Sequence, residues 1–113
     1  MEARLIVVAG KLPKAEFVLD QEEILIGRDP AALIRLDNPL ASRRHCLVCH
    51  DRGRFLVRDL GSHNGTLVND VPVTVRALED GDRISVADSV FVFASAGKPA
   101  RPRPEVRESA DAT

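Results

Sequence analysis

Residues 46–57 read CLVCHDRGRFLV, and this stretch decides the fold class. Two short apolar runs, Cys46-Leu47-Val48-Cys49 and Phe55-Leu56-Val57, flank the turn formers Asp51-Arg52-Gly53. Apolar runs rich in β-branched and aromatic residues favour pleated strands, and a short Gly-containing connection between them is typical of a hairpin. We therefore expect two antiparallel strands here.

The same pattern extends outward over the first ninety-odd residues. Eight further short apolar or alternating runs occupy residues 5–8, 17–19, 24–26, 34–36, 66–68, 73–75, 83–86 and 90–93. Turn formers separate them at residues 11–13, 29–30, 37–39, 64–65, 69–72 and 80–82. Ten short strands at roughly ten-residue spacing, with no strong amphipathic helix between them, predict an antiparallel sandwich or barrel. Only residues 30–33 are expected to add one helical turn.

Composition excludes several classes of function. The 113 residues carry a net charge of −1, and Trp and Tyr are absent. The four Phe fall in predicted strands, so no global basic field and no stacking platform favour nucleic-acid binding. No apolar run is long enough for a membrane span, and Lys11 interrupts the N-terminal apolar run too early for a signal peptide. We expect a cytoplasmic protein with no membrane and no nucleic-acid partner.

The last seventeen residues differ from the rest of the chain. Residues 97–104 alternate Pro with small or basic residues, and residues 105–113 are polar. Closely spaced prolines favour an extended conformation and bury little. We expect a folded domain over residues 1–96 and a flexible tail or linker over residues 97–113, and we expect the chain to be the N-terminal regulatory part of a longer protein.

Two predicted loops, at residues 37–45 and 61–66, together with Gly27-Arg28, are rich in guanidinium, hydroxyl, amide and imidazole groups and poor in carboxylates. Such a set suits a compact anion such as a phosphate monoester. Each piece taken alone has an ordinary explanation, because Gly27-Arg28 can be a strand end with a solvated Arg. Likewise Asn64-Gly65 can be a tight turn.

The order and spacing of these pieces add a more specific indication. Gly27-Arg28, residues 42–45 (SRRH), residues 62–66 (SHNGT) with Val68-Asn69, and residues 78–84 (LEDGDRI) follow one another along the chain. Over residues 5–94 this arrangement strongly resembles the forkhead-associated (FHA) domain family, of bacterial type. The resemblance implies an all-β, FHA-like β-sandwich of about eleven mostly antiparallel strands, with loops at one end that bind phosphothreonine peptides.

The resemblance also implies roles for individual residues. Arg28 matches the residue that pairs with the phosphate, and Ser42 matches a hydroxyl donor to a phosphate oxygen. Arg43 occupies a position with a basic or polar contact to phosphate or peptide. Asn64 matches the side chain that bonds the peptide backbone. His63 departs from the small hydroxyl or amide residues usual before that Asn, and we expect its imidazole to contact the phosphate and to tighten binding at mildly acidic pH.

A second group matches supporting positions of the family. His45 resembles the buried His that braces the Ser-bearing loop, and Gly27, Gly65 and Thr66 resemble structural positions. Ala87 stands where many relatives have Gly, so a loop distant from the phosphate is expected to differ slightly.

The rival interpretations come from other classes. Residues 46–50 (CLVCH) match the haem-attachment pattern, but Cys46 and Cys49 on one strand point to opposite faces and cannot hold one porphyrin or zinc ion together. Ser42 lies in no nucleophile elbow, and there is no nucleotide-binding Gly-Lys loop, so we expect no enzyme, no cofactor and no metal.

The expected function is therefore a non-catalytic signalling module for phosphothreonine-containing proteins, with a Ser/Thr kinase or its substrate as candidate partner. The alternative is phospho-independent protein–protein interaction or self-association. Ser109 and Thr113 in the tail are candidate phosphorylation sites for capture in cis or by a neighbour.

Overall fold

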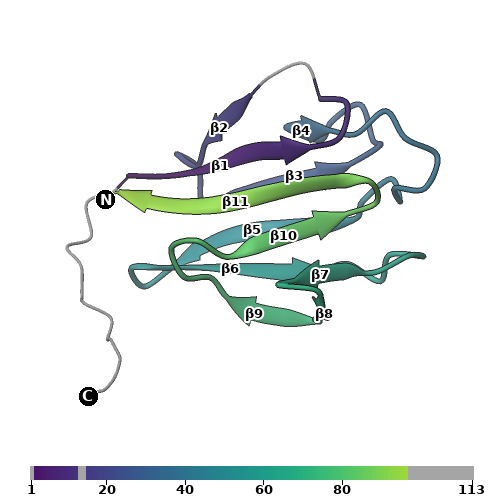
Figure 1. Cartoon of the computed structure of the whole chain (residues 1–113). Coiled ribbons are helices and arrows are strands. Elements are labelled where there is room, and N and C mark those ends of the chain that lie inside the picture. The colour runs from purple at the N-terminus through teal and green to yellow at the C-terminus, as the bar shows by residue number, and fades with distance from the viewer. Residues whose placement is uncertain (1, 13–14, 97–113) are drawn as a thin grey trace.

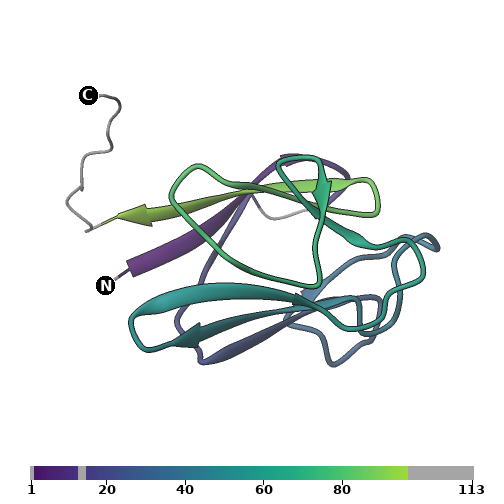
Figure 2. The ribbon, with the colours of Figure 1, turned by 90° about the horizontal axis from the view of Figure 1, so that it is seen from below.

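The computed structural model describes residues 2–12 and 15–96, and it shows two β-sheets packed as two layers (Figures 1 and 2). Eleven strands form in these residues: β1 (Glu2–Ala9), β2 (Glu16–Val18), β3 (Glu23–Gly27), β4 (Ile34–Arg35), β5 (Cys46–Asp51), β6 (Arg54–Asp59), β7 (Thr66–Val68), β8 (Val71–Pro72), β9 (Val75–Ala77), β10 (Arg83–Val86) and β11 (Ser89–Ala96). The predicted tail, with Ser109 and Thr113, lies outside the described residues.

One sheet has six strands in the order β2-β1-β11-β10-β7-β8, and the other has five in the order β4-β3-β5-β6-β9. All neighbouring strands run antiparallel except β3 and β4, which pair in parallel. The predicted sandwich of about eleven mostly antiparallel strands is confirmed. The described residues contain no helix, and no segment of them could cross a membrane as one.

Strand alternation builds the core between the sheets. In β3, β5, β6 and β10 every second side chain is buried. Side chains at those positions point into one face of a pleated sheet, so the alternation in the sequence becomes one shared apolar layer. The largest buried side chains of this layer are those of Leu5, Ile24, Ile26, Ile34, Leu36, Val48, Val57, Val68, Ile84, Val86 and Phe91.

The prediction of one helical turn at residues 30–33 is wrong. The Asp29 carboxylate accepts a hydrogen bond from the Ala31 N–H at 2.9 Å, and the Asp29 carbonyl accepts one from the Ala32 N–H at 2.8 Å. These two bonds close a turn at residues 29–32, and no helix forms there. The chain then enters β4 at Ile34.

The prediction of one strand at residues 73–75 is also wrong. Val71–Pro72 forms β8 at the edge of the six-stranded sheet, and Val75–Ala77 forms β9 at the edge of the five-stranded sheet. Residues 73–74 carry the chain from one layer to the other. Val73 is apolar because it packs against the core during this crossing, and its apolar character resembled that of a strand residue.

Three loops gather at one end of the sandwich, at the right of Figure 1: residues 28–33, 36–45 and 60–65. They connect β3 to β4, β4 to β5 and β6 to β7. The turn that joins β5 to β6 lies at the opposite end, at the left of Figure 1. The three polar pieces of sequence described above therefore meet in space.

Candidate functional site

Gly27 ends β3 directly beneath the backbone of the β4–β5 loop. A Cβ atom added to Gly27 would lie 2.0 Å from the Arg43 carbonyl oxygen, so no other residue fits without moving that backbone. The N–H groups of Arg28 and Asp29 donate to the carbonyls of Ser42 and Arg43, at 3.0 and 3.1 Å. The two loops are thereby joined through their backbones, and glycine is required by this close approach.

Arg28 is exposed, and its Nε donates to the Ala41 carbonyl at 2.5 Å. This bond fixes the guanidinium beside the β4–β5 loop. Its two terminal nitrogens make no hydrogen bond or ion pair to any described residue. A guanidinium held in this way can present paired donors to a planar or tetrahedral oxyanion.

His45 is completely buried and joins the two site loops. Its Nδ1 accepts a hydrogen bond from the Ser42 N–H at 3.0 Å, so the ring proton lies on Nε2, which donates to the Gly65 carbonyl at 2.8 Å. One imidazole therefore sets the distance between the loop that carries Ser42 and the loop that carries Asn64.

The side chains of Ser42 and Asn64 each form a hydrogen bond to the backbone of the loop that carries the other residue. The His63 N–H donates to the Ser42 Oγ at 2.9 Å, and the Asn64 Nδ2 donates to the Leu40 carbonyl at 2.7 Å. The Ser42 hydroxyl donates to no described residue, so its proton is available to a ligand. Asn64 is exposed, and its Oδ1 and second amide hydrogen have no partner among the described residues.

Asp59, the last residue of β6, organises the β6–β7 loop. Its carboxylate accepts hydrogen bonds from the Gly61 N–H, the Ser62 N–H and hydroxyl, and the Thr66 hydroxyl, at 2.5–3.1 Å. Burial alone would raise the pKa of Asp59, but these donors outweigh it and hold the pKa below its usual range. The ionised carboxylate thus fixes the loop that presents Asn64.

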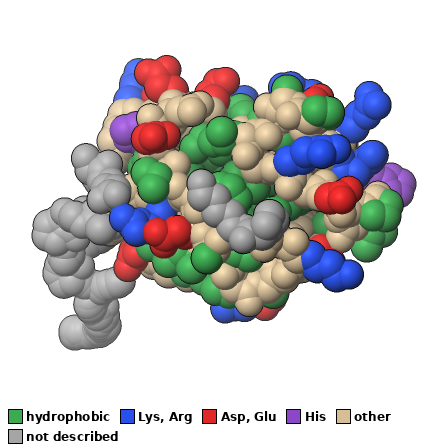
Figure 3. Space-filling view, turned by 90° about the horizontal axis from the view of Figure 1, so that it is seen from above, with side chains coloured by type: hydrophobic (Ala, Val, Ile, Leu, Met, Phe, Trp, Pro, Cys, Tyr) green, Lys and Arg blue, Asp and Glu red, His purple; other side chains and the backbone are tan. Residues whose placement is uncertain are grey.

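The loop end carries four arginines. Arg28, Arg35, Arg43 and Arg44 are all exposed, and none forms an ion pair within the described ranges 2–12 and 15–96. Figure 3 shows Lys and Arg side chains at this end of the molecule, together with Asp or Glu side chains. His63 is also exposed there. The whole chain is slightly acidic, so this charge is local.

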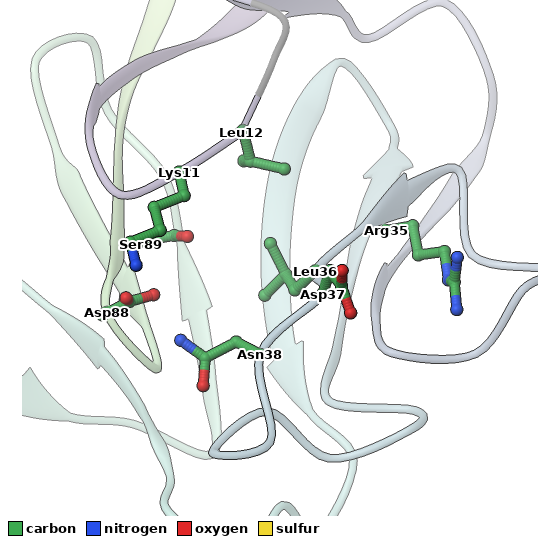
Figure 4. A pocket seen from close by; sticks show the side chains of 8 residues that line it. All are labelled: Lys11, Leu12, Arg35, Leu36, Asp37, Asn38, Asp88 and Ser89. Carbon is green, nitrogen blue, oxygen red and sulfur yellow. The ribbon is translucent and has the colours of Figure 1, made fainter.

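Two hollows adjoin the loops. One, of about 180 Å³, is lined by Leu40, Asn64, Gly65, Leu67, Ser85, Ala87 and Asp88. The other, of about 70 Å³, has Lys11, Asp88 and Ser89 on one side and Leu36 and Asp37 on the other (Figure 4). The first directly borders Asn64, so an extended chain bonded to that side chain would pass over it.

The structure thus brings together the predicted residues Arg28, Ser42, Arg43, His63 and Asn64 on adjoining loops. Sequence reasoning missed Asp59, which holds the β6–β7 loop, and Leu40, which is 57% exposed beside Asn64. The only signal for Asp59 was an acidic residue just before the Gly61-Ser62 turn, an ordinary turn context.

The cysteines lie apart from these loops. Cys46 is fully buried, and burial raises the pKa of its thiol to about 12, whereas Cys49 lies partly exposed on the outer face of the same sheet. Within the described residues, no group of three or more His, Cys, Asp or Glu side chains could hold a metal ion.

Comparisons with known proteins agree with the fold. The oxoglutarate dehydrogenase inhibitor of Corynebacterium efficiens is 41% identical over 91 residues, which cover 80% of this chain and 64% of that protein. The glycogen accumulation regulator GarA of Mycolicibacterium smegmatis is 38% identical over 96 residues, covering 85% and 61%. The chain thus spans less than two thirds of the length of these relatives.

Solved structures show the same architecture. A domain from a structural and functional analysis of phosphothreonine-dependent FHA domain interactions superposes with a TM-score of 0.79 at 32% identity, covering 87% of this chain and all of that one. Mycobacterium tuberculosis EmbR in complex with a low-affinity phosphopeptide gives a TM-score of 0.78 at 29% identity, covering 88% of this chain and 26% of EmbR. The model of the FHA domain family matches residues 24–87. The chain belongs to the FHA domain family.

Proposed function

We propose that this FHA domain is a non-catalytic module that binds phosphothreonine-containing peptides at its loop end. The observation that carries the proposal is the set of exposed arginines without ion-pair partners among the described residues, next to Ser42 and Asn64. One relative is named as an inhibitor of oxoglutarate dehydrogenase and another as a regulator of glycogen accumulation, and the EmbR neighbour was solved with a phosphopeptide.

The charges favour a phosphate monoester over a carboxylate. A phosphothreonine carries nearly two negative charges at neutral pH and three strong acceptor oxygens. The terminal nitrogens of Arg28 and the Ser42 hydroxyl supply donors on one side, and Arg43 supplies a second cation on the adjoining backbone. A carboxylate would leave part of this donor set unused.

Asn64 fits the backbone of an extended peptide. Its side chain is held through one amide hydrogen on the Leu40 carbonyl, which leaves a carbonyl oxygen and one amide hydrogen facing solvent. A peptide group offers one donor and one acceptor, so a single amide side chain can bond it twice. The neighbouring hollow of about 180 Å³, with Leu40 at its rim, would then receive a side chain of the peptide near the phosphothreonine.

The test is a fluorescence-polarisation titration of the 113-residue chain with peptide pools that contain phosphothreonine, phosphoserine or unphosphorylated threonine at the fixed position. We expect micromolar binding of the phosphothreonine pool, about −8 kcal/mol. Arg28→Ala should weaken binding by about 2 kcal/mol or more, roughly thirtyfold. Arg83→Ala, which removes an exposed arginine from β10 far from the loops, is the matched control and should bind as the parent does.

Equal binding of all three pools, or equal loss in the two arginine variants, would refute the proposal. Phosphate-independent binding to a folded protein would favour the alternative function as a protein–protein interaction module. The candidate partner classes remain a Ser/Thr kinase and the substrates of such a kinase, because both supply phosphothreonine in a protein context.

A further inference from the structure

The outer face of the five-stranded sheet carries a group of apolar side chains although it faces solvent. The inward positions of these strands form the core, so the alternate side chains must point outward. The apolar side chains among them, which we call the outer apolar face, are Leu25, Leu47, Cys49, Leu56, Val75 and Ala77. Arg58 lies between Leu47 and Val75 in the same cross-strand row, and Glu23 lies beside Cys49. Val75 is 50% exposed and the other apolar side chains are partly exposed.

Charged residues lie within and beside this face. Glu23 and Asp51 lie on the β3 and β5 side, and Arg54 and Arg58 lie on β6. None of these four forms an ion pair with a described residue. On the six-stranded sheet, by contrast, Arg4 on β1 pairs with Glu16 on β2 at 3.0 Å. These four charged side chains are therefore available to an outside partner.

We propose that the outer apolar face binds a second copy of this chain, through a two-fold axis parallel to the strands and midway between β5 and β6. The cross-strand pairs Asp51–Arg54, Cys49–Leu56 and Leu47–Arg58 define the register at this position. An axis between the two strands exchanges the members of each pair, so the surface meets itself in a self-complementary way.

This symmetry pairs opposite charges at the hairpin end and apolar groups further along the strands, and it places Leu47 against the Arg58 side chain of the second copy. Asp51 of one copy faces Arg54 of the other, and the contact occurs twice. Cys49 faces Leu56 of the second copy, and Leu25 faces Val75, because β3 and β9 flank the central pair symmetrically. Sheets stacked face to face lie about 10 Å apart, a distance that these side chains fill.

The rest of the chain offers no comparable occupant for this face. The predicted tail, residues 97–113, contains Val106 as its only large apolar residue. None of the residues proposed to contact phosphopeptide contributes a side chain to the face. The proposed dimer therefore leaves both loop ends open to ligand, and it does not depend on the proposed phosphopeptide function.

The test is sedimentation velocity of the 113-residue chain from about 10 µM to about 1 mM, because a small interface predicts weak association. We expect a reversible monomer–dimer equilibrium. Arg54→Glu should weaken the dimer about tenfold, since both symmetric contacts become repulsive. The double variant Asp51→Arg/Arg54→Glu restores opposite charges and should recover dimerisation.

Arg83→Glu, a charge reversal on the other sheet, is the matched control and should leave the equilibrium unchanged. Cross-linking at Cys49 with a bismaleimide of about 10 Å span should trap the dimer, because Cys46 is fully buried and does not compete. A chain that stays monomeric at the highest concentration would overturn the proposal. So would a dimer that Arg54→Glu does not weaken, or one that the double variant fails to restore.

Discussion

The two connections that flank β6 show two ways of ending a strand. At one end of the sandwich, β5 joins β6 through Arg52 and Gly53 alone, with φ of 55° and 78°. No side-chain hydrogen bond within the described residues supports that turn. At the other end, the β6–β7 loop is held by the Asp59 carboxylate, by His45 and by the Ser42 hydroxyl.

The difference separates a connection that only reverses the chain from one that presents side chains. A two-residue turn with positive φ matches strand twist and needs no further support. The β6–β7 loop must hold Asn64 and the facing hydroxyl of Ser42 at fixed positions before any ligand arrives. Buried polar groups with full hydrogen bonding supply that order, and they also make the loop sensitive to substitution.

The largest contrast is expected between two glycines. Gly27→Ala should destabilise the fold by about 3 kcal/mol or more, because the added Cβ meets a backbone carbonyl at 2.0 Å. Gly53→Ala meets no atom within 4 Å and has only its positive φ to accommodate, at about 1 kcal/mol. Urea unfolding followed by circular dichroism measures both. Equal losses would contradict the close approach at Gly27.

The two histidines should differ next. His45→Ala leaves the Ser42 N–H and the Gly65 carbonyl without their partner. We expect this change to lower the free energy of unfolding by about 2–3 kcal/mol and also to weaken phosphopeptide binding. His50→Ala on the β5–β6 hairpin removes only a stacking contact with Phe55 at 4.4 Å, and about 1 kcal/mol is expected. Thermal unfolding and peptide titration test the pair, and unchanged affinity in His45→Ala would remove its bracing role.

Asp59→Asn should cost about 1–2 kcal/mol at pH 7, because the ionised carboxylate accepts four hydrogen bonds. The pKa of Asp59 is lowered in the fold, so its contribution to stability is fully present above the ordinary value of 3.8. That contribution is lost as the pH falls through the lower folded pKa.

The difference between parent and Asp59→Asn should therefore stay constant from pH 7 down to the ordinary pKa of 3.8 and shrink as the pH falls further in urea unfolding. Asp51→Asn, at the exposed end of the hairpin, is the control and should change stability by about 0.5 kcal/mol or less. A difference that is constant with pH would show that the charge of Asp59 does not support the loop.

The smallest effect concerns His63. Phosphate next to an exposed imidazole favours the imidazolium form, so we expect phosphopeptide affinity to rise a few-fold, relative to His63→Asn, from pH 7.5 to about pH 6. Protonation of the phosphate itself affects both proteins equally and cancels in the ratio. The control His50→Asn lies at the hairpin end, and its phosphopeptide affinity should change with pH as that of the parent does. Identical pH dependence in His63→Asn would remove the role assigned to this residue.

Most strands could be predicted from the sequence, because apolar residues alternate along β3, β5, β6 and β10 in the same way as the buried side chains do. It could not predict the crossing at residues 73–74. Val73 is apolar on account of packing against the core, and local pattern does not distinguish such a residue from a strand residue. Sheet membership is a long-range property, so β8 and β9 were merged.

Some site residues could be predicted from their chemical type and their order along the chain. Others could not, because their role depends on contacts that form only in the folded protein. Arg28, Ser42 and Asn64 stood out by their order along the chain, as the family resemblance made plain. Asp59 did not, because its four donors come from residues that only the folded loop brings around one carboxylate. The register that aligns Asp51 with Arg54 likewise required the paired strands.

The most direct test of the account is an NMR titration of the isotope-labelled chain with the phosphothreonine peptide that binds most tightly among those of the phosphothreonine pool. We predict that amide shifts change at Arg28, at residues 40–43 and at residues 62–65, while those of Arg52 and Gly53 stay constant. Shift changes confined to the hairpin end or to the outer apolar face would contradict the assignment of the loop end as the ligand-binding site, as would no shift change at a saturating peptide concentration.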